Sequence, residues 1–159
     1  FNKNKKISIS DLIMESWQTL KPLAEKKDIK INLFSPTKYY ISGDIENLKR
    51  AFINILDNAI RYSPTKEGIQ IEIFKRDSSV VIRVRDKGIG LEENESNDIF
   101  SRFYRGDPSR TKFKKSGSGL GLSITKKIIN NNKGFIKAFN HKDGGAIIET
   151  IFPCINTDL

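Results

Sequence analysis

The chain has 159 residues, of which 37% are hydrophobic and 30% are charged, and its formal net charge is +9. These values exclude a disordered chain and predict one globular domain with a single core. No segment approaches the roughly 18 to 20 apolar residues of a membrane helix, and a single cysteine, Cys154, excludes an internal disulfide. The positive charge suits a nucleic acid, an anionic membrane or a polyphosphate ligand.

Four elements are predicted at the start of the chain: a strand over 5–10, a helix over 11–27, and strands over 29–34 and 39–42. Ser10 is the expected cap of the helix, and Pro22 is expected to bend or weaken its last turns. Because Phe1 is not a start methionine, we expect the chain to be a piece of a longer parent protein, and a membrane anchor elsewhere in that parent is compatible with the sequence.

A long helix over 44–64 is the central prediction. Its apolar residues share one face at helical spacing: Ile45, Leu48, Phe52, Ile55, Leu56 and Ala59. Its polar residues share the opposite edge: Asn47, Arg50, Asn54, Asn58 and Arg61. Asn54 and Asn58 lie one turn apart and can direct two amide oxygens at one hard cation, such as the Mg²⁺ that accompanies phosphates. The alternative is an ordinary solvated face.

The remaining elements are two hairpins and a helix. Strands are predicted over 68–75 and 80–85, a short helix over 98–104, a helix over 119–131, and strands over 134–139 and 146–152. The fold class is therefore α+β: a two-layer α/β sandwich with a mixed, mostly antiparallel sheet of about five strands and three main helices on one face.

Two glycine motifs follow the central helix. Asp86-Lys87-Gly88-Ile89-Gly90 comes directly after a predicted strand, where a carboxylate can accept a hydrogen bond from an exocyclic amine and glycines allow close ligand approach. The segment 117–122, GSGLGL, leads into a helix and can present backbone N–H groups to phosphate. Taken singly, the first motif is more often a strand-ending turn, and the second is better explained as a flexible helix entry. A basic cluster lies between them: Arg102, Arg105, Arg110, Lys112, Lys114 and Lys115.

In order and spacing, NILDNAIRYSP, DKGIG, IFSRFYRGD and GSGLGLSI closely resemble the catalytic ATP-binding domain of sensor histidine kinases. That domain belongs to the Bergerat-type superfamily shared with Hsp90, DNA gyrase and MutL. The resemblance covers essentially the whole chain. It implies the Bergerat fold, ATP and Mg²⁺ as cofactors, and protein-histidine kinase activity that donates the γ-phosphate to a histidine on a separate domain.

The resemblance also implies a role for each matching residue. Asn58, with Asn54, would coordinate Mg²⁺, and Asp86 would bind the adenine amino group in a pocket shaped by Gly88 and Gly90. The other implied nucleotide contacts are Arg61 and Tyr62 beside the phosphates or ribose, Phe100 and Phe103 anchoring an ATP lid, Arg105 on the terminal phosphates, and Gly117, Gly119, Leu120 and Gly121 at the lid hinge. Asn58 and Arg105 are the expected catalytic residues.

Asn54 discriminates within this superfamily. In the ATP-hydrolysing members the residue one turn before the metal asparagine is a glutamate that activates water, and an amide cannot act as that base. This favours a histidine kinase over an ATPase, since a neutral imidazole is already a nucleophile. His141, the only histidine, lies in a predicted turn without the context of a phosphoacceptor, so we do not assign it that role.

The implied organisation is the end of a linker over 1–6, a catalytic domain over 7–155 with a lid over about 91–118, and a tail over 156–159. The expected partners are ATP, an absent dimerisation and phosphoacceptor domain of the same protein, and a response regulator; nucleic acid and membrane contact are not expected. The expected location is cytoplasmic. Two alternatives stay open: a Bergerat-type ATPase, and a non-catalytic module that binds nucleotide, nucleic acid or an acidic protein.

Overall fold

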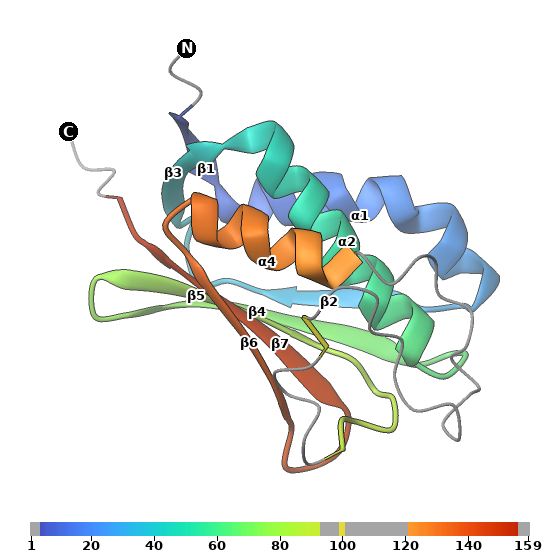
Figure 1. Ribbon diagram of the computed structural model, residues 1–159. Helices are drawn as coiled ribbons and strands as arrows, with labels where there is room; N and C mark the ends of the chain where they lie inside the picture. Colours follow the sequence, from blue (N-terminus) through green and yellow to red (C-terminus); the bar gives the residue numbers. More distant parts are fainter. Residues whose placement is uncertain (1–3, 93–98, 101–120, 156–159) are drawn as a thin grey trace.

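The computed structural model describes residues 4–92, 99–100 and 121–155. It has two layers, in which three helices lie on one face of a five-stranded sheet (Figure 1). The helices are α1 (Ile9–Lys26), α2 (Ile45–Tyr62) and α4 (Gly121–Asn131). The α+β sandwich predicted from the sequence is confirmed. None of the helices in the described ranges is long and apolar enough to span a membrane.

The sheet has the strand order β2-β4-β5-β7-β6, in which β2 and β4 are parallel and the other pairs are antiparallel. Its strands are β2 (Lys30–Phe34), β4 (Gly68–Arg76), β5 (Ser79–Arg85), β6 (Phe135–Asn140) and β7 (Ala146–Pro153). A separate two-stranded sheet pairs β1 (Asn4–Ser8) with β3 (Tyr40–Asp44). The sequence predicts all seven strands but not that β2 and β3 belong to different sheets.

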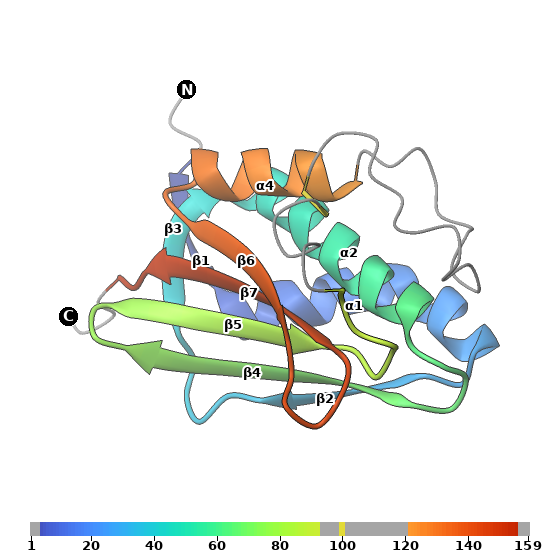
Figure 2. The same ribbon diagram turned by 60° about the horizontal axis from the view of Figure 1, so that its bottom comes forward.

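Helix α2 lies between α1 and α4 (Figure 2). Its predicted apolar face is buried except at Ile45, which is half-buried. Phe52 is fully buried and its ring centroid lies 6.4 Å from that of Phe152 on β7, so the helix packs directly onto the sheet. Burying such side chains is the main stabilising contribution to a fold of this size. The core therefore fixes the orientation of α2 and, with it, the direction of its polar edge.

The structure corrects the predicted start of α1. The cap is Ser8, whose hydroxyl accepts from the backbone N–H of Asp11, whereas Ser10 already lies inside the helix. The earlier start places Ile9 in the core, where it has no exposed surface. The helix contains Pro22 and ends at Lys26, one residue before the predicted end, and Leu20 and Ala24 on either side of the proline are buried.

The start of α2 is connected to the end of α4 by one buried amide. Asn132 Oδ1 accepts from the backbone N–H of Asp44, the N-cap of α2, at 2.9 Å, and Asn132 Nδ2 donates to Ile128 O at 2.8 Å. A side chain at Gly43 would come within 2.8 Å of the same amide oxygen, so only glycine leaves room for this contact. The two helices that carry predicted site residues are thereby held together.

Candidate nucleotide site

The predicted polar edge of α2 is confirmed. Asn47, Arg50 and Arg61 are exposed, while Asn54 and Asn58 are half-buried one turn apart. A half-buried amide is partly shielded from water but still reachable by a ligand. Asn54 and Asn58 are therefore partly shielded from water and still accessible to a cation that arrives with a ligand.

Asn54 connects α2 to the first residue of α4. Its Nδ2 donates to Gly121 O at 3.2 Å, and the hydroxyl of Thr125 donates to the same carbonyl at 2.7 Å. Because the nitrogen is engaged, Oδ1 is the part of the Asn54 amide available to a cation. The side chain of Asn58, one turn further on, makes no hydrogen bond to a residue in the described ranges. Both amides thus retain an oxygen for a ligand.

Arg61 lies on the same edge but pairs with Asp57, its Nε being 3.1 Å from each carboxylate oxygen. Both side chains are partly exposed, and an i, i+4 pair of this kind stabilises a helix by only about 0.3–0.5 kcal/mol. A phosphate group carrying more charge can compete for the guanidinium. The ion pair therefore holds Arg61 near the edge without fixing it there.

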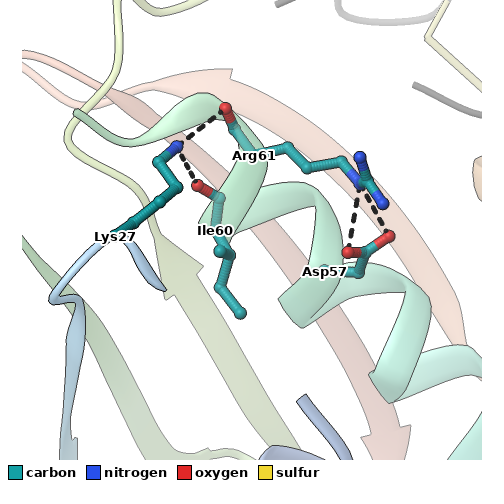
Figure 3. A network of polar contacts seen from close by, with 4 residues as sticks. All are labelled: Lys27, Asp57, Ile60 and Arg61. Carbon is teal, nitrogen blue, oxygen red and sulfur yellow. Dashed lines mark hydrogen bonds and ion pairs between the residues drawn. The ribbon is translucent and has the colours of Figure 1, made fainter. Parts of the chain in front are cut away.

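Lys27 holds the C-terminal end of α2, as Figure 3 shows. Its ammonium donates to Ile60 O at 2.7 Å and to Arg61 O at 3.3 Å, which satisfies carbonyls left unpaired at the helix terminus. Partial burial, followed by the charge of Arg61, lowers the pKa of Lys27. This contact is absent from the sequence prediction, since the two partners are more than thirty residues apart.

Asp86 follows β5 and is 7% exposed. Its Oδ1 accepts from the backbone N–H groups of Gly88 at 2.8 Å and Ala146 at 3.2 Å. Burial raises the pKa of this carboxyl, while the two N–H groups and the charge of Arg85 offset part of the increase. It makes no ion pair with any residue in the part of the chain that the structure describes. A buried carboxylate of this kind is a candidate ligand group.

The first glycine motif lies against the C-terminal end of α2. A side chain at Gly88 would approach the backbone oxygen of Tyr62 to 2.2 Å, and the N–H of Lys87 donates to the buried hydroxyl of Ser63 at 3.1 Å. Gly90 has φ +80°, a conformation that favours glycine. The predicted requirement for glycine at these two positions is therefore explained by close approach at one and backbone conformation at the other.

Together these contacts place Gly88 of the first glycine motif and Gly121, the first described residue of the second, at different points along α2. Gly121 lies at Asn54, whereas Gly88 lies at Tyr62, eight residues or about 12 Å further along the helix. A ligand with a polar ring at one end and phosphates at the other can therefore contact Asp86 and the amide edge at the same time. The arrangement suits an extended nucleotide.

Phe100 is buried, and Lys126 of α4 lies over its ring with Nζ 5.9 Å from the centroid. The residue belongs to the core, as expected of an anchor. The remaining predicted contacts, Phe103, Arg105, Gly117, Gly119 and Leu120, lie outside the described residues, as do the basic cluster and nearly all of the helix predicted over 98–104.

The side-chain atoms available as metal ligands at this site are oxygens, the type of ligand that Mg²⁺ prefers. In the described ranges no group of three or more histidine, cysteine, aspartate or glutamate side chains is placed to hold a metal. The available donors are the oxygens of Asn54 and Asn58, and Mg²⁺ prefers oxygen ligands and keeps several waters when it also holds phosphates. The residues present therefore fit a metal that arrives with its nucleotide.

The sequence prediction missed the contribution of the β6–β7 hairpin. Gly145 has φ +80°, and a side chain there would approach the backbone oxygen of Asp86 to 2.0 Å. Asn140 bonds to the backbone of Leu91. The turn at Asp143-Gly144-Gly145 is visible in the sequence, but nothing in it indicates that this turn contacts a motif some fifty residues away.

Comparison with known proteins gives concordant matches. Residues 43–155 match the family described as histidine kinase-, DNA gyrase B-, and HSP90-like ATPase. The chain is 32% identical over 157 residues to the sensor protein SphS of Synechococcus elongatus, covering 95% of this chain and 38% of that protein. It is also 32% identical over 149 residues to the sensor histidine kinase CusS of Escherichia coli, covering 94% of this chain and 31% of that protein.

Among solved structures, the nucleotide-free catalytic domain of histidine kinase ThkA matches with a TM-score of 0.81 and 25% identity, over 94% of this chain and 95% of that chain. A mycobacterial sensor histidine kinase, MprB, matches with a TM-score of 0.80 and 25% identity, over 95% and 97%. The chain thus spans less than two-fifths of the two sensor proteins above and nearly all of an isolated catalytic domain.

Proposed function

We propose a function from the premise that this chain belongs to the family of histidine kinase-, DNA gyrase B- and HSP90-like ATPases and is an ATP-binding catalytic domain of the sensor-histidine-kinase type. From that premise we propose that it transfers the γ-phosphate of ATP to a histidine on a separate domain of the same protein. The observation that carries the proposal is the pair of half-buried amides, Asn54 and Asn58, on a helix whose C-terminal end contacts the buried carboxylate motif of Asp86.

Asp86 is the proposed reader of the base. Its Oδ1 is occupied by two backbone N–H groups, which fix the orientation of the carboxylate and leave its other oxygen to accept from the adenine amino group. A carbonyl oxygen at that position of the base would face the carboxylate as a second acceptor. Adenine is therefore preferred to guanine or hypoxanthine.

Asn58, assisted by Asn54, is the proposed magnesium ligand. The metal would neutralise charge on the phosphates during transfer. Arg61 would contact the phosphates after leaving Asp57, and Gly121, at the start of α4, lies where backbone N–H groups favour an anion. Arg105, Gly117, Gly119 and Leu120 are proposed to complete the phosphate contacts.

The residue at position 54 favours phosphotransfer over hydrolysis. An amide does not accept a proton at neutral pH, so Asn54 cannot activate a water molecule. A neutral histidine needs positioning and charge neutralisation rather than a base, because its ring nitrogen is already nucleophilic. The phosphohistidine would then supply a response regulator. We place the domain in the cytoplasm.

Titration calorimetry of the chain with ATP, ADP and GTP, with and without Mg²⁺, tests the proposal. We expect Mg²⁺-dependent ATP binding that Asn58→Ala weakens, little hydrolysis, and no self-labelling. Asn47→Ala, which removes an exposed amide from the same helix edge three turns earlier, is the matched control and leaves binding unchanged. Steady ATP hydrolysis by the chain alone would indicate an ATPase, and equal affinity for GTP would refute the assignment of Asp86.

A further inference from the structure

The β6–β7 hairpin contacts the first glycine motif through a two-sided amide contact. Asn140, the last residue of β6, accepts from the backbone N–H of Leu91 through Oδ1 at 2.7 Å and donates from Nδ2 to the backbone oxygen of Leu91 at 2.9 Å. A side chain thereby pairs with both backbone groups of one residue, as a neighbouring strand would. The two residues are 49 positions apart, so this contact fixes tertiary geometry.

The same hairpin holds Asp86 directly. The backbone N–H of Asp86 donates to Ala146 O at 3.0 Å, and the N–H of Ala146 donates to Asp86 Oδ1 at 3.2 Å. Arg85 adds a contact to the turn, with Nη2 donating to Gly144 O at 2.8 Å. The segment 86–91 is therefore attached to the hairpin at both of its ends, by Ala146 at the first residue and by Asn140 at the last.

Between those two attachments the backbone makes a tight turn. Gly90 has φ +80°, and a side chain there would approach Asn140 Oδ1 to 2.8 Å. The N–H of Gly88, which orients the Asp86 carboxylate, lies within the same turn. If Leu91 were released, the turn would lose its attachment to β6, and the contacts of Asp86 with Ala146 and of Lys87 with Ser63 would be left to hold the first part of the turn, so the donor from Gly88 would be oriented less firmly.

We propose that Asn140 is a positioning residue for base recognition: by binding both backbone groups of Leu91, it holds the turn that orients the Asp86 carboxylate toward the adenine amino group. This inference rests on the proposed role of Asp86. Asn140 acts through the backbone and does not itself contact the nucleotide.

Asn140→Ala and Asn140→Asp separate positioning from folding. The alanine variant loses both contacts, whereas the aspartate variant keeps an acceptor for Leu91 N–H and loses the donor. We expect Asn140→Ala to lower ATP affinity about tenfold, by loss of orientation equivalent to one or two hydrogen bonds, with Asn140→Asp intermediate. Asn32→Ala, an exposed asparagine on the edge strand β2, is the matched control and changes nothing.

The decisive readout is the ratio of the affinities for ATP and inosine triphosphate, in which a carbonyl oxygen replaces the amino group. If Asn140 positions Asp86, Asn140→Ala reduces this ratio toward one. The ratio is measured at temperatures at which circular dichroism shows that the variant is folded. A merely structural role would lower the melting temperature and both affinities while keeping the ratio, and would overturn the inference. If the unmodified chain does not prefer ATP, the role of Asp86 fails; if it does and Asn140→Ala keeps that preference, only the role of Asn140 fails.

Discussion

Two buried carboxylates, one on β7 and one directly after the neighbouring strand β5, have opposite surroundings. Glu149 on β7 has no exposed surface and faces three cations, with Arg83 Nε at 2.8 Å, Lys137 Nζ at 3.4 Å and Arg76 Nη2 at 4.0 Å. Asp86, after β5, is met by backbone N–H groups and makes no ion pair with a described residue. The protein surrounds one carboxylate with its own cations and, among the described residues, pairs the other with none.

This difference distinguishes a carboxylate with a structural ion-pair network from the one that we propose reads the base. Arg83 and Lys137 stand directly opposite Glu149 on the neighbouring strands, and Arg83 also lies over the rings of Phe74 and Phe139 at 5.1 and 5.8 Å. That network connects four strands on the face of the sheet away from the helices. Asp86 has no such network among the described residues. Its ionised form therefore destabilises the fold, and a hydrogen-bond donor on a ligand would offset that destabilisation.

The largest expected effect on ATP affinity comes from removing the charge of Asp86. We expect Asp86→Asn to reduce ATP affinity by about 10- to 100-fold, because a charge-assisted hydrogen bond to the base is lost. The melting temperature at neutral pH should be unchanged or higher, since burial raises the pKa of Asp86 and the ionised form destabilises the fold. Calorimetry and thermal denaturation check the two parts. A large loss of stability would make Asp86 a structural residue.

Glu149→Gln should have the opposite profile. We expect a loss of about 1–3 kcal/mol in the free energy of unfolding, because three cations, all of them partly exposed to water, lose their shared partner. ATP affinity should not change. Asp11→Asn, which removes the exposed ion pair between Asp11 and Lys38, is the control and has a much smaller effect in urea denaturation. Weakened ATP binding by the folded Glu149 variant would remove the distinction between the two carboxylates.

The pH dependence of the folding stability gives a further test of the difference between Asp86 and Glu149. Because the pKa of Asp86 is raised in the folded state, stability is greater below the unfolded value, near 3.8, and is lost as the pH rises through the folded value. Asp86→Asn should therefore gain stability relative to the unmodified chain over that window and keep the gain at higher pH. As the pH is lowered, Asp86 becomes protonated and the preference for ATP over inosine triphosphate should decline. Because the pKa is raised, this decline should begin at a higher pH than it would for an aspartate with the ordinary pKa. Melting curves that run parallel through the window would argue against a raised pKa.

Lys27 provides the smallest expected effect. It is a partly buried charge that binds carbonyls rather than a carboxylate, and Lys27→Met removes the contacts to Ile60 and Arg61 while keeping most of the side chain. We expect a loss of about 0.5–1 kcal/mol in stability, the usual contribution of a cation at a helix C-terminus. Lys26→Met, in the exposed last turn of α1, is the control. Equal unfolding free energies for the two variants would show that Lys27 does not stabilise α2.

The sequence predicted what depends on local pattern. The period of Leu48, Phe52 and Ile55 predicted both the core face of α2 and the edge carrying Asn54 and Asn58, because a helix fixes the relation between its faces. Asp86 was assigned from its place after a strand and before two glycines, and the structure shows it buried and held by Gly88.

What the sequence could not predict depends on contacts between distant segments. The parallel pairing of β2 with β4, the amide of Asn140 on Leu91 and the ammonium of Lys27 on Ile60 each join residues more than thirty positions apart. No local pattern specifies such a partner. The cap of α1 was misassigned for a different reason, because Ser8 and Ser10 are equally good caps and the burial of Ile9 decides between them.

A crystal structure of the chain with Mg²⁺ and a non-hydrolysable ATP analogue tests the central claim most directly. The account predicts the adenine amino group at about 3 Å from the carboxylate of Asp86 and the metal at about 2.0–2.1 Å from Asn58 Oδ1. A metal bound away from the amide edge of α2, or an adenine ring away from the turn between Asp86 and Leu91, would contradict it.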